Sequence, residues 1–261
     1  MKKGVSTAVK KNGTIYYRSS ITYNGKHISL GSFSEEEAAF FCYQEAACLL
    51  KSQRKITDYS SDSPLSFDKW VSLVNFRDNH VYFKNPIYVQ KSYFYYYFDL
   101  SEIFIFDIDD LFFYSSHKLQ KRGGHLFVND YGMQLNIAGR YGIRNFSVLG
   151  KDYYFKNGDD HDYRYSNIII VNRYHGVTRR EQKGILSYRA KIHINGDYII
   201  GDYKEEIQAA IAYNKAADLL KRSGFNKNYA LNFIDCLSGR EYAEIYTQTE
   251  ISDKIKKLCR K

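Results

Sequence analysis

The sequence predicts an α+β fold in which two three-stranded antiparallel sheet-plus-helix modules flank a separate middle domain. Three observations lead to this prediction: an internal repeat, an Asn-Gly pair between alternating strands in each copy, and an alanine-rich helical pattern that follows each pair. With 261 residues, of which 44% are hydrophobic and 17% aromatic, the chain is long enough for two or three small domains and too apolar for disorder.

The repeat relates residues 4–50 to residues 176–220. Tyr17-Arg18 matches Tyr188-Arg189 at the same offset at which Asn24-Gly25 matches Asn195-Gly196. After one residue is lost from the second hairpin, the following residues stay in register: Gly31, Ala46-Ala47 and Leu49-Leu50 match Gly201, Ala216-Ala217 and Leu219-Leu220. This many ordered matches indicate a duplicated unit.

Each copy is predicted to form two strands, a tight turn, a third strand and a helix. Asn-Gly is typical of a two-residue hairpin turn, in which both central residues need φ > 0. Before the second turn, apolar and polar residues alternate, so that Ala190 and Ile192 face one side and Arg189, Lys191 and His193 face the other. Capping-box patterns, Ser34-x-x-Glu37 and Asp202-x-x-Glu205, are expected to begin the two helices.

A three-stranded sheet with one helix leaves its other face open. In the second copy this face is predicted to carry Thr178, Arg180, Arg189, Lys191, His193 and Ile199. In the first copy the same positions hold Ser6, Ala8, Arg18, Ser20, Thr22, His27 and Ser29. Strands can present such side chains to base edges in the major groove. The first face has fewer basic residues and is therefore expected to bind more weakly, and the alternative is that both faces are merely solvated.

The second copy, with Tyr188-Arg189-Ala190-Lys191-Ile192 and Ala216-Ala217, resembles the Apetala-type DNA-binding domain of plant ethylene-response factors, which also occurs in phage integrases and homing endonucleases. In that family the three-stranded sheet reads the major groove. Carried over by position, the resemblance implies that His175, Thr178, Arg180, Lys191 and His193 contact bases or phosphates. The expected DNA-binding residues are His175, Thr178, Arg179, Arg180, Arg189, Lys191 and His193 in the second module, and Lys10, Arg18, Ser20, Thr22 and His27 in the first.

Residues 105–173 resemble phage-type HNH homing endonucleases through Lys156-Asn157-Gly158-Asp159, Arg164 and Ser166-Asn167-Ile168. The resemblance implies a degenerate ββα fold, because the catalytic histidine and asparagine of the family fall on Phe155 and Tyr163. Phenylalanine neither accepts a proton nor binds a metal, and tyrosine is a poor base at neutral pH. We therefore expect no catalytic residue, no metal, no cofactor and no enzymatic activity.

An alternative metal site remains open at Asp159, Asp160, His161 and Asp162, which are close enough in sequence to hold a cation in another way. The competing interpretation is a solvated turn. Asn167, at the last position of the HNH pattern, is expected to be structural.

Composition points to nucleic acid and to a reducing compartment. A net charge of +9 favours a polyanionic partner, here double-stranded DNA. The four cysteines, among which Cys42 and Cys48 are predicted core residues, form no C-x-x-C pair, which argues against zinc and disulfides. The basic start lacks the apolar core of a signal peptide and no apolar run is long enough for a membrane span, so a cytoplasmic location is expected. The resemblance to phage-type proteins implies that this cytoplasm is that of a bacterial host, with the protein associated with the nucleoid through DNA.

The predicted domains are a first module at 1–55, a linker or aromatic-rich segment at 56–104, the HNH-like domain at 105–173, a second module at 174–235 and a basic helix at 236–261. That helix would present Lys254, Lys256, Lys257, Arg260 and Lys261 to phosphates. The aromatic run at 93–98 is expected to form either core or the contact of a homodimer.

These features favour a sequence-specific DNA-binding protein, a transcriptional repressor of a phage or mobile element derived from a homing endonuclease that lost cleavage. Two alternatives stay open. One is an active metal-dependent HNH endonuclease, and the other is a structural or inhibitory protein that binds other proteins through its aromatic segment.

Overall fold

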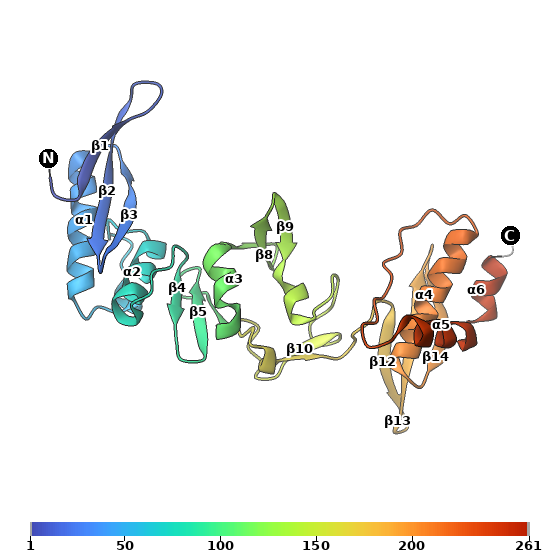
Figure 1. Cartoon of the computed structure of the whole chain (residues 1–261). Coiled ribbons are helices and arrows are strands. Elements are labelled where there is room, and N and C mark those ends of the chain that lie inside the picture. The colour runs from blue at the N-terminus through green and yellow to red at the C-terminus, as the bar shows by residue number, and fades with distance from the viewer. Residues whose placement is uncertain (1, 260–261) are drawn as a thin grey trace. The chain divides into compact units, whose positions relative to one another are not determined.

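The computed structural model describes residues 2–259 and has a mixed α+β fold with several small antiparallel sheets and six α-helices (Figure 1). Its internal contacts separate two compact units. The first comprises Met1–Ile137 with Asp159–Asn167, and the second comprises Ala138–Gly158 with Ile168–Lys261. The predicted α+β class is confirmed, and each unit contains one copy of the repeat.

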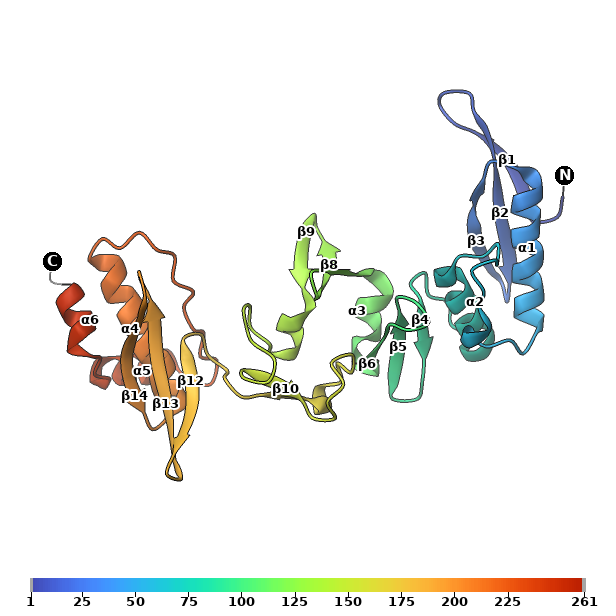
Figure 2. The same ribbon diagram turned by 180° about the vertical axis from the view of Figure 1, so that it is seen from behind.

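The first repeat folds as a three-stranded antiparallel sheet with a helix along one face (Figures 1 and 2). Its elements are β1 (Val5–Val9), β2 (Ile15–Tyr23), β3 (Lys26–Phe33) and α1 (Glu36–Lys51). Along β2, Ser19 and Ile21 are buried against α1, whereas Arg18 and Thr22 are exposed. This alternation is that of a strand buried on one side only.

The core of this module continues into the segment predicted to be a linker. Helix α2 (Phe67–Asn79) contributes Trp70 and Leu73 to the same core as Ile28 and Leu49. The first part of the predicted linker is therefore structured, and that prediction was wrong. The physical reason is size: one helix on three short strands buries too little apolar surface, and α2 adds the missing cover.

The remainder of the first unit consists of two small antiparallel sheets and a short helix. Their elements are β4 (Ile87–Val89), β5 (Tyr93–Tyr97), β6 (Ile103–Asp107), α3 (Leu111–Ser116), β7 (Leu119–Arg122), β8 (His125–Asp130) and β9 (Met133–Asn136). Within the aromatic run, Phe94 and Tyr96 are buried, while Tyr93 and Tyr95 are half-buried. The expected core role is confirmed for the two buried rings.

The second unit pairs two short strands and then builds the second module. Its elements are β10 (Tyr153–Phe155), β11 (Ile168–Ile170), β12 (Val177–Gln182), β13 (Ile185–His193), β14 (Asp197–Tyr203), α4 (Glu206–Arg222), α5 (Gly239–Gln248) and α6 (Asp253–Leu258). Strand order in the module is β12-β13-β14, with α4 against one face. Between β11 and β12 the described chain has no helix, although a ββα motif would place one after its strand pair.

The C-terminal segment forms two short helices instead of the predicted single basic helix. Helix α5 begins at a capping box made by Ser238 and Glu241. Ile255 of α6 is buried in the core of the second module, so these helices cover α4 much as α2 covers α1. Arg260 and Lys261, which were expected to extend the basic helix, lie outside the described residues.

Two local features recur in both modules. Gly4 and Gly176 have positive φ values of 77° and 72°, and a Cβ at either position would collide with a helix tyrosine, Tyr43 in α1 or Tyr213 in α4. The middle strand is irregular at one equivalent place in each copy, after Ser19 in β2 and after the matching alanine in β13. The two copies thus share backbone detail as well as sequence.

The starts of the two helices differ from the prediction. Their N-cap residues are Glu35 and Glu205, and neither side chain makes a cap hydrogen bond. The two predicted capping boxes therefore do not form. Ser34 lies one residue before its cap, and Asp202 lies in β14, where its carboxylate accepts hydrogen bonds from Arg189.

The two hairpin turns also differ from each other. Asn24 and Gly25 have φ values of 42° and 75°, as predicted for a two-residue turn. In the second module the ladder closes at His193 and Asp197, which leaves a three-residue loop whose Asn-Gly pair is not in the positive-φ region. By strand register, the residue missing from the second copy corresponds to Lys26, which directly follows the Asn-Gly pair of the first copy, so the two turns differ in length.

Candidate nucleic-acid interface

The outer face of the second sheet carries the residues that the alternation predicted. Strand register places on it Thr178, Arg180, Arg189, Lys191, His193 and Ile199. Ala190 and Ile192, which alternate with them along β13, are buried against α4. The expected division of β13 into an inner and an outer face is confirmed.

Each basic side chain on the outer face of β13 has an acidic partner on β14. Nε and Nη2 of Arg189 each donate to a carboxylate oxygen of Asp202, at 2.7 Å. Nδ1 of His193 lies 3.0 Å from one oxygen of Asp197, and Nζ of Lys191 lies 3.8 Å from the other. The hydrogen bond from Arg189 lowers the pKa of Asp202, and the one from His193 lowers that of Asp197, so both carboxylates stay ionised at neutral pH.

Two of the expected DNA contacts lie off this face. Arg179 is on the opposite side of β12, with an exposed side chain. His175 precedes β12, where its main-chain N–H donates to Oδ1 of Asn232 (2.6 Å) and its ring packs edge-on against Tyr213. Burial lowers the pKa of His175, and the charge of Arg144 lowers it further, so the imidazole is neutral at pH 7.

The outer face of the first sheet is built from smaller residues. Register and exposure place on it Ser6, Ala8, Arg18, Ser20, Thr22, His27 and Ser29. Sequence reasoning missed Tyr16, which pairs with Ala8 on the same face and accepts hydrogen bonds from Arg18. The ammonium of Lys10, in the turn after β1, lies 5.9 Å from the Tyr16 ring centroid. The same alternation that identified Arg18 would have identified Tyr16.

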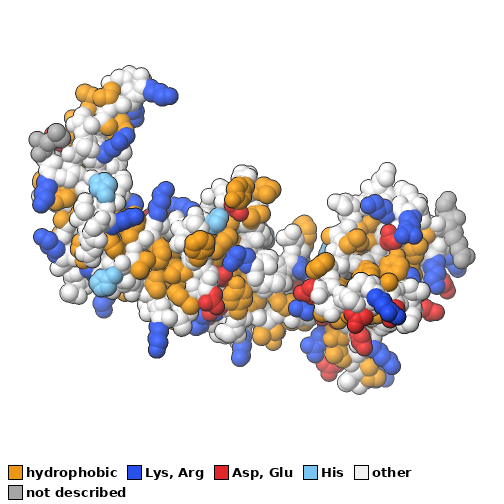
Figure 3. Space-filling view, in the orientation of Figure 1, with side chains coloured by type: hydrophobic (Ala, Val, Ile, Leu, Met, Phe, Trp, Pro, Cys, Tyr) orange, Lys and Arg blue, Asp and Glu red, His pale blue; other side chains and the backbone are white. Residues whose placement is uncertain are grey.

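The two faces differ in how their basic charge is balanced. Strands β1–β3 contain no acidic residue, and the positions of Asp197 and Asp202 are occupied there by His27 and Ser32. On the side shown in Figure 3, acidic side chains are scarce over the first module and more frequent over the second. The prediction that the second face is the more cationic one took no account of these carboxylates, and the ion pairs remove its basis.

The residues at the HNH positions are buried or hydrogen-bonded within the fold. Phe155 is buried in β10, which belongs to the second unit, whereas Tyr163 and Asn167 belong to the first. The Asn167 amide donates to the main-chain carbonyl of Asp162 (2.9 Å), and the buried Asp162 carboxylate receives two hydrogen bonds from the guanidinium of Arg164. These contacts give Asn167 and Arg164 roles in holding the loop.

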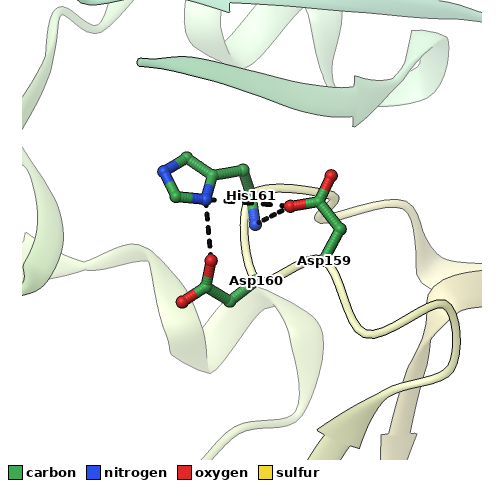
Figure 4. A group of neighbouring side chains, drawn as sticks. All are labelled: Asp159, Asp160 and His161. Atoms are coloured by element: carbon green, nitrogen blue, oxygen red, sulfur yellow. Dashed lines mark hydrogen bonds and ion pairs between the residues drawn. The ribbon is translucent and has the colours of Figure 1, made fainter. Parts of the chain in front are cut away.

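Among the described residues, one side-chain group has the composition of a metal site. Nδ1 of His161 lies 2.7 Å from a carboxylate oxygen of Asp160 and 3.7 Å from one of Asp159 (Figure 4). Its imidazole also stacks on Phe104, with ring centroids 4.5 Å apart. Both acids are exposed. Asp162, the fourth residue predicted here, is committed to Arg164 instead.

No family model, curated protein or solved structure matches this chain. Within the part of the chain that the structure describes, no helix combines the length and apolar character needed to cross a membrane.

Proposed function

We propose that this chain binds duplex DNA in a sequence-specific manner through the outer faces of β1–β3 and β12–β14. One observation carries the proposal. In both modules a small sheet is covered by a helix on one side, and its other side bears alternating polar and basic side chains, including the equivalent Arg18 and Arg189. Strands of this kind fit the major groove, and a net charge of +9 supplies attraction to phosphates.

We further propose that the protein is a transcriptional repressor of a phage or mobile element and that it descends from a homing endonuclease that lost cleavage. Phe155 and Tyr163, at the positions where the chemistry needs histidine and asparagine, support the loss. A protein that holds a specific site without cutting it obstructs transcription there. Its place would be the cytoplasm of a bacterial host, on the nucleoid.

Selection from a pool of random duplexes, followed by affinity measurements at several salt concentrations, tests DNA binding. Arg18→Ala and Arg189→Ala should each weaken the free energy of DNA binding by about 1–3 kcal/mol if the side chains reach bases. Arg240→Ala is the matched control, because Arg240 is an exposed arginine on α5 whose one ion pair among the described residues is with Glu244. Equal affinities for all three variants would refute the assignment of the sheet faces.

The form of the selected site addresses the oligomer. A palindrome would indicate a two-fold homodimer, whereas one long asymmetric site would indicate that a single chain uses both modules.

The group formed by Asp159, Asp160 and His161 favours a second candidate, an active metal-dependent endonuclease. Incubation of the protein with its selected duplex and Mg²⁺ or Mn²⁺ separates the two proposals. We expect intact DNA. Strand breaks that appear with the wild-type chain and disappear with Asp159→Ala and His161→Ala would replace the repressor by the nuclease.

A further inference from the structure

A cationic cavity lies next to the outer face of β12–β14, entirely within the second unit. Its volume is about 470 Å³. The basic side chains around it come from three parts of the chain: Arg144 and Lys151 from the loop before β10, Lys191 and His193 from β13, and Lys227 from the segment after α4. The cavity therefore continues the face already proposed to contact DNA.

The acidic residues at this cavity are already engaged. Asp152 accepts hydrogen bonds from the main-chain N–H of Val148 (2.8 Å) and from the side chain of Asn172 (2.9 Å), so it fastens its own loop. Asp197 is held by His193 and lies near Lys191. Four lysine and arginine side chains thus surround two carboxylates, which leaves a net positive site.

Arg144 has a donor that no described protein group satisfies, although Asp152 and Glu206 attract the charge of its guanidinium. Its Nε is buried, and among the described residues it has no hydrogen-bond partner. Burial also lowers the pKa of this guanidinium, although arginine remains charged at any physiological pH. A buried, charged donor without an acceptor is costly, and an anion in the cavity would relieve that cost.

The rim of the cavity presents an aromatic ring in an unfavourable backbone conformation. Phe146 is 96% exposed and has a φ of 66°, a region that bulky residues rarely adopt. The turn that holds it is closed by a hydrogen bond from Ser147 N–H to the Arg144 carbonyl, and its i+2 position, which glycine or asparagine usually occupies, is Phe146. The strained backbone costs stability, and residues held in such conformations are found preferentially at functional positions.

We propose that this cavity takes a backbone phosphate of duplex DNA, with Arg144 as its main ligand, and that the Phe146 ring wedges against the neighbouring base-pair step. The proposal rests on the DNA-binding function stated above and adds a contact outside the repeated module. Apolar side chains that enter between base steps from a cationic anchor are a known mode of DNA binding. Such a contact would place the duplex across the β12–β14 face and the 144–147 turn together.

Two variants separate the anchor from the wedge. Arg144→Gln should weaken binding to the selected duplex by about 5- to 50-fold and reduce the slope of log K against log salt by about 0.9, the contribution of one phosphate. Phe146→Gly should weaken binding several-fold without changing that slope, because its contact is not electrostatic. It should also raise the melting temperature, because glycine adopts a positive φ without strain. A variant that is more stable yet binds more weakly cannot be explained by misfolding.

Matched controls are Arg240→Gln, which removes an equal charge on α5, and Phe112→Ala, which removes an exposed ring on α3. If wild type binds and Arg189→Ala weakens it, but Arg144→Gln behaves like Arg240→Gln or Phe146→Gly binds like wild type, this proposal is overturned while DNA binding stands. Absence of duplex binding by wild type would overturn both.

A last arm tests for a free anion in place of a DNA phosphate. Inorganic phosphate at constant ionic strength should raise the melting temperature of the wild type no more than it raises that of the Arg144→Gln variant. Selective stabilisation of wild type would assign the cavity to a small phosphate ligand and overturn the DNA contact.

Discussion

The ion pair between Arg189 and Asp202 provides the sharpest test of the proposed sheet face, through the variant Asp202→Ser. Serine occupies the equivalent position in the first module, at Ser32, so the change is one that this fold already accommodates. In the wild-type chain both donors of the guanidinium fork are directed at the carboxylate, at 2.7 Å. The variant frees that fork and adds one positive charge to the face.

The magnitudes follow from the exposure of the pair. The Arg189 and Asp202 side chains are 25% and 44% exposed, so solvent screens their attraction, and its loss should cost only about 0.2–1 kcal/mol of folding stability. A freed arginine that reaches a phosphate should make the slope of log K against log salt steeper by about 0.9. At low salt we expect about fivefold tighter binding to non-specific duplex, or about 1 kcal/mol.

Fluorescence anisotropy with a labelled duplex of about 30 base pairs, at four or more salt concentrations, measures both quantities. Glu244→Gln is the control, because it adds the same charge on α5 by breaking the exposed pair with Arg240. If Asp202→Ser and Glu244→Gln give the same affinity and the same slope, Arg189 does not face DNA and the assignment of this surface is wrong.

Three further predictions concern stability and reactivity. Gly176→Ala should lower the free energy of unfolding by more than about 2 kcal/mol, because the new Cβ would collide with a helix tyrosine. Gly184→Ala, also at positive φ but with no described atom within 4 Å of the new Cβ, should lower it by about 1 kcal/mol. Urea unfolding of the two variants compares these losses. The lowered pKa of His175 means that the unfolded chain takes up the proton first, so stability should fall as pH drops below 6.5, and His175→Gln should flatten that dependence between pH 7.5 and 5.5. If the stability of the wild type and of His175→Gln fell equally with pH, this assignment would be contradicted. Burial raises the pKa of Cys42 to about 11, so iodoacetamide at pH 8 should alkylate the exposed Cys48 long before Cys42 in the native chain; equal rates would show that the Cys42 site opens.

The parts of the fold that the sequence predicted were those governed by local periodicity. Alternation along residues 185–193 placed Ala190 inside and Arg189 outside, and both assignments are confirmed because a pleated strand allows only two faces. The Asn24-Gly25 turn was predicted correctly for the same local reason.

The features that the sequence did not predict depend on contacts between distant residues. The cover of α1 by Trp70 and the burial of Ile255 against α4 arise from tertiary packing, which leaves no periodic signal that assigns a helix to its neighbour. Asp202 was expected to cap a helix, but an arginine thirteen residues earlier in the chain offered it a stronger partner. Cys48 was expected in the core and is exposed, because it lies on the outer side of α1.

In the candidate site, too, the sequence predicted the features set by local periodicity and missed those that depend on distant residues. Pattern alone identified the row of residues on each sheet, apart from Tyr16. It could not identify the carboxylates that face them or the cavity beside Arg144, since the residues that form that cavity are separated by more than eighty positions. The DNA-binding role itself remains a prediction.

The helices that cover the two modules have a practical meaning for dissection of the protein. The repeat ends at Leu50 and Leu220, yet the apolar side of α1 is closed by α2, and that of α4 by α5 and α6. The covering helices lie outside the repeated segments, and each is supplied by the chain that follows its own copy. A fragment cut at the limits of the repeat would expose that apolar side and aggregate. An autonomous fragment of the second module has to extend to Leu258, and one of the first has to include Asn79.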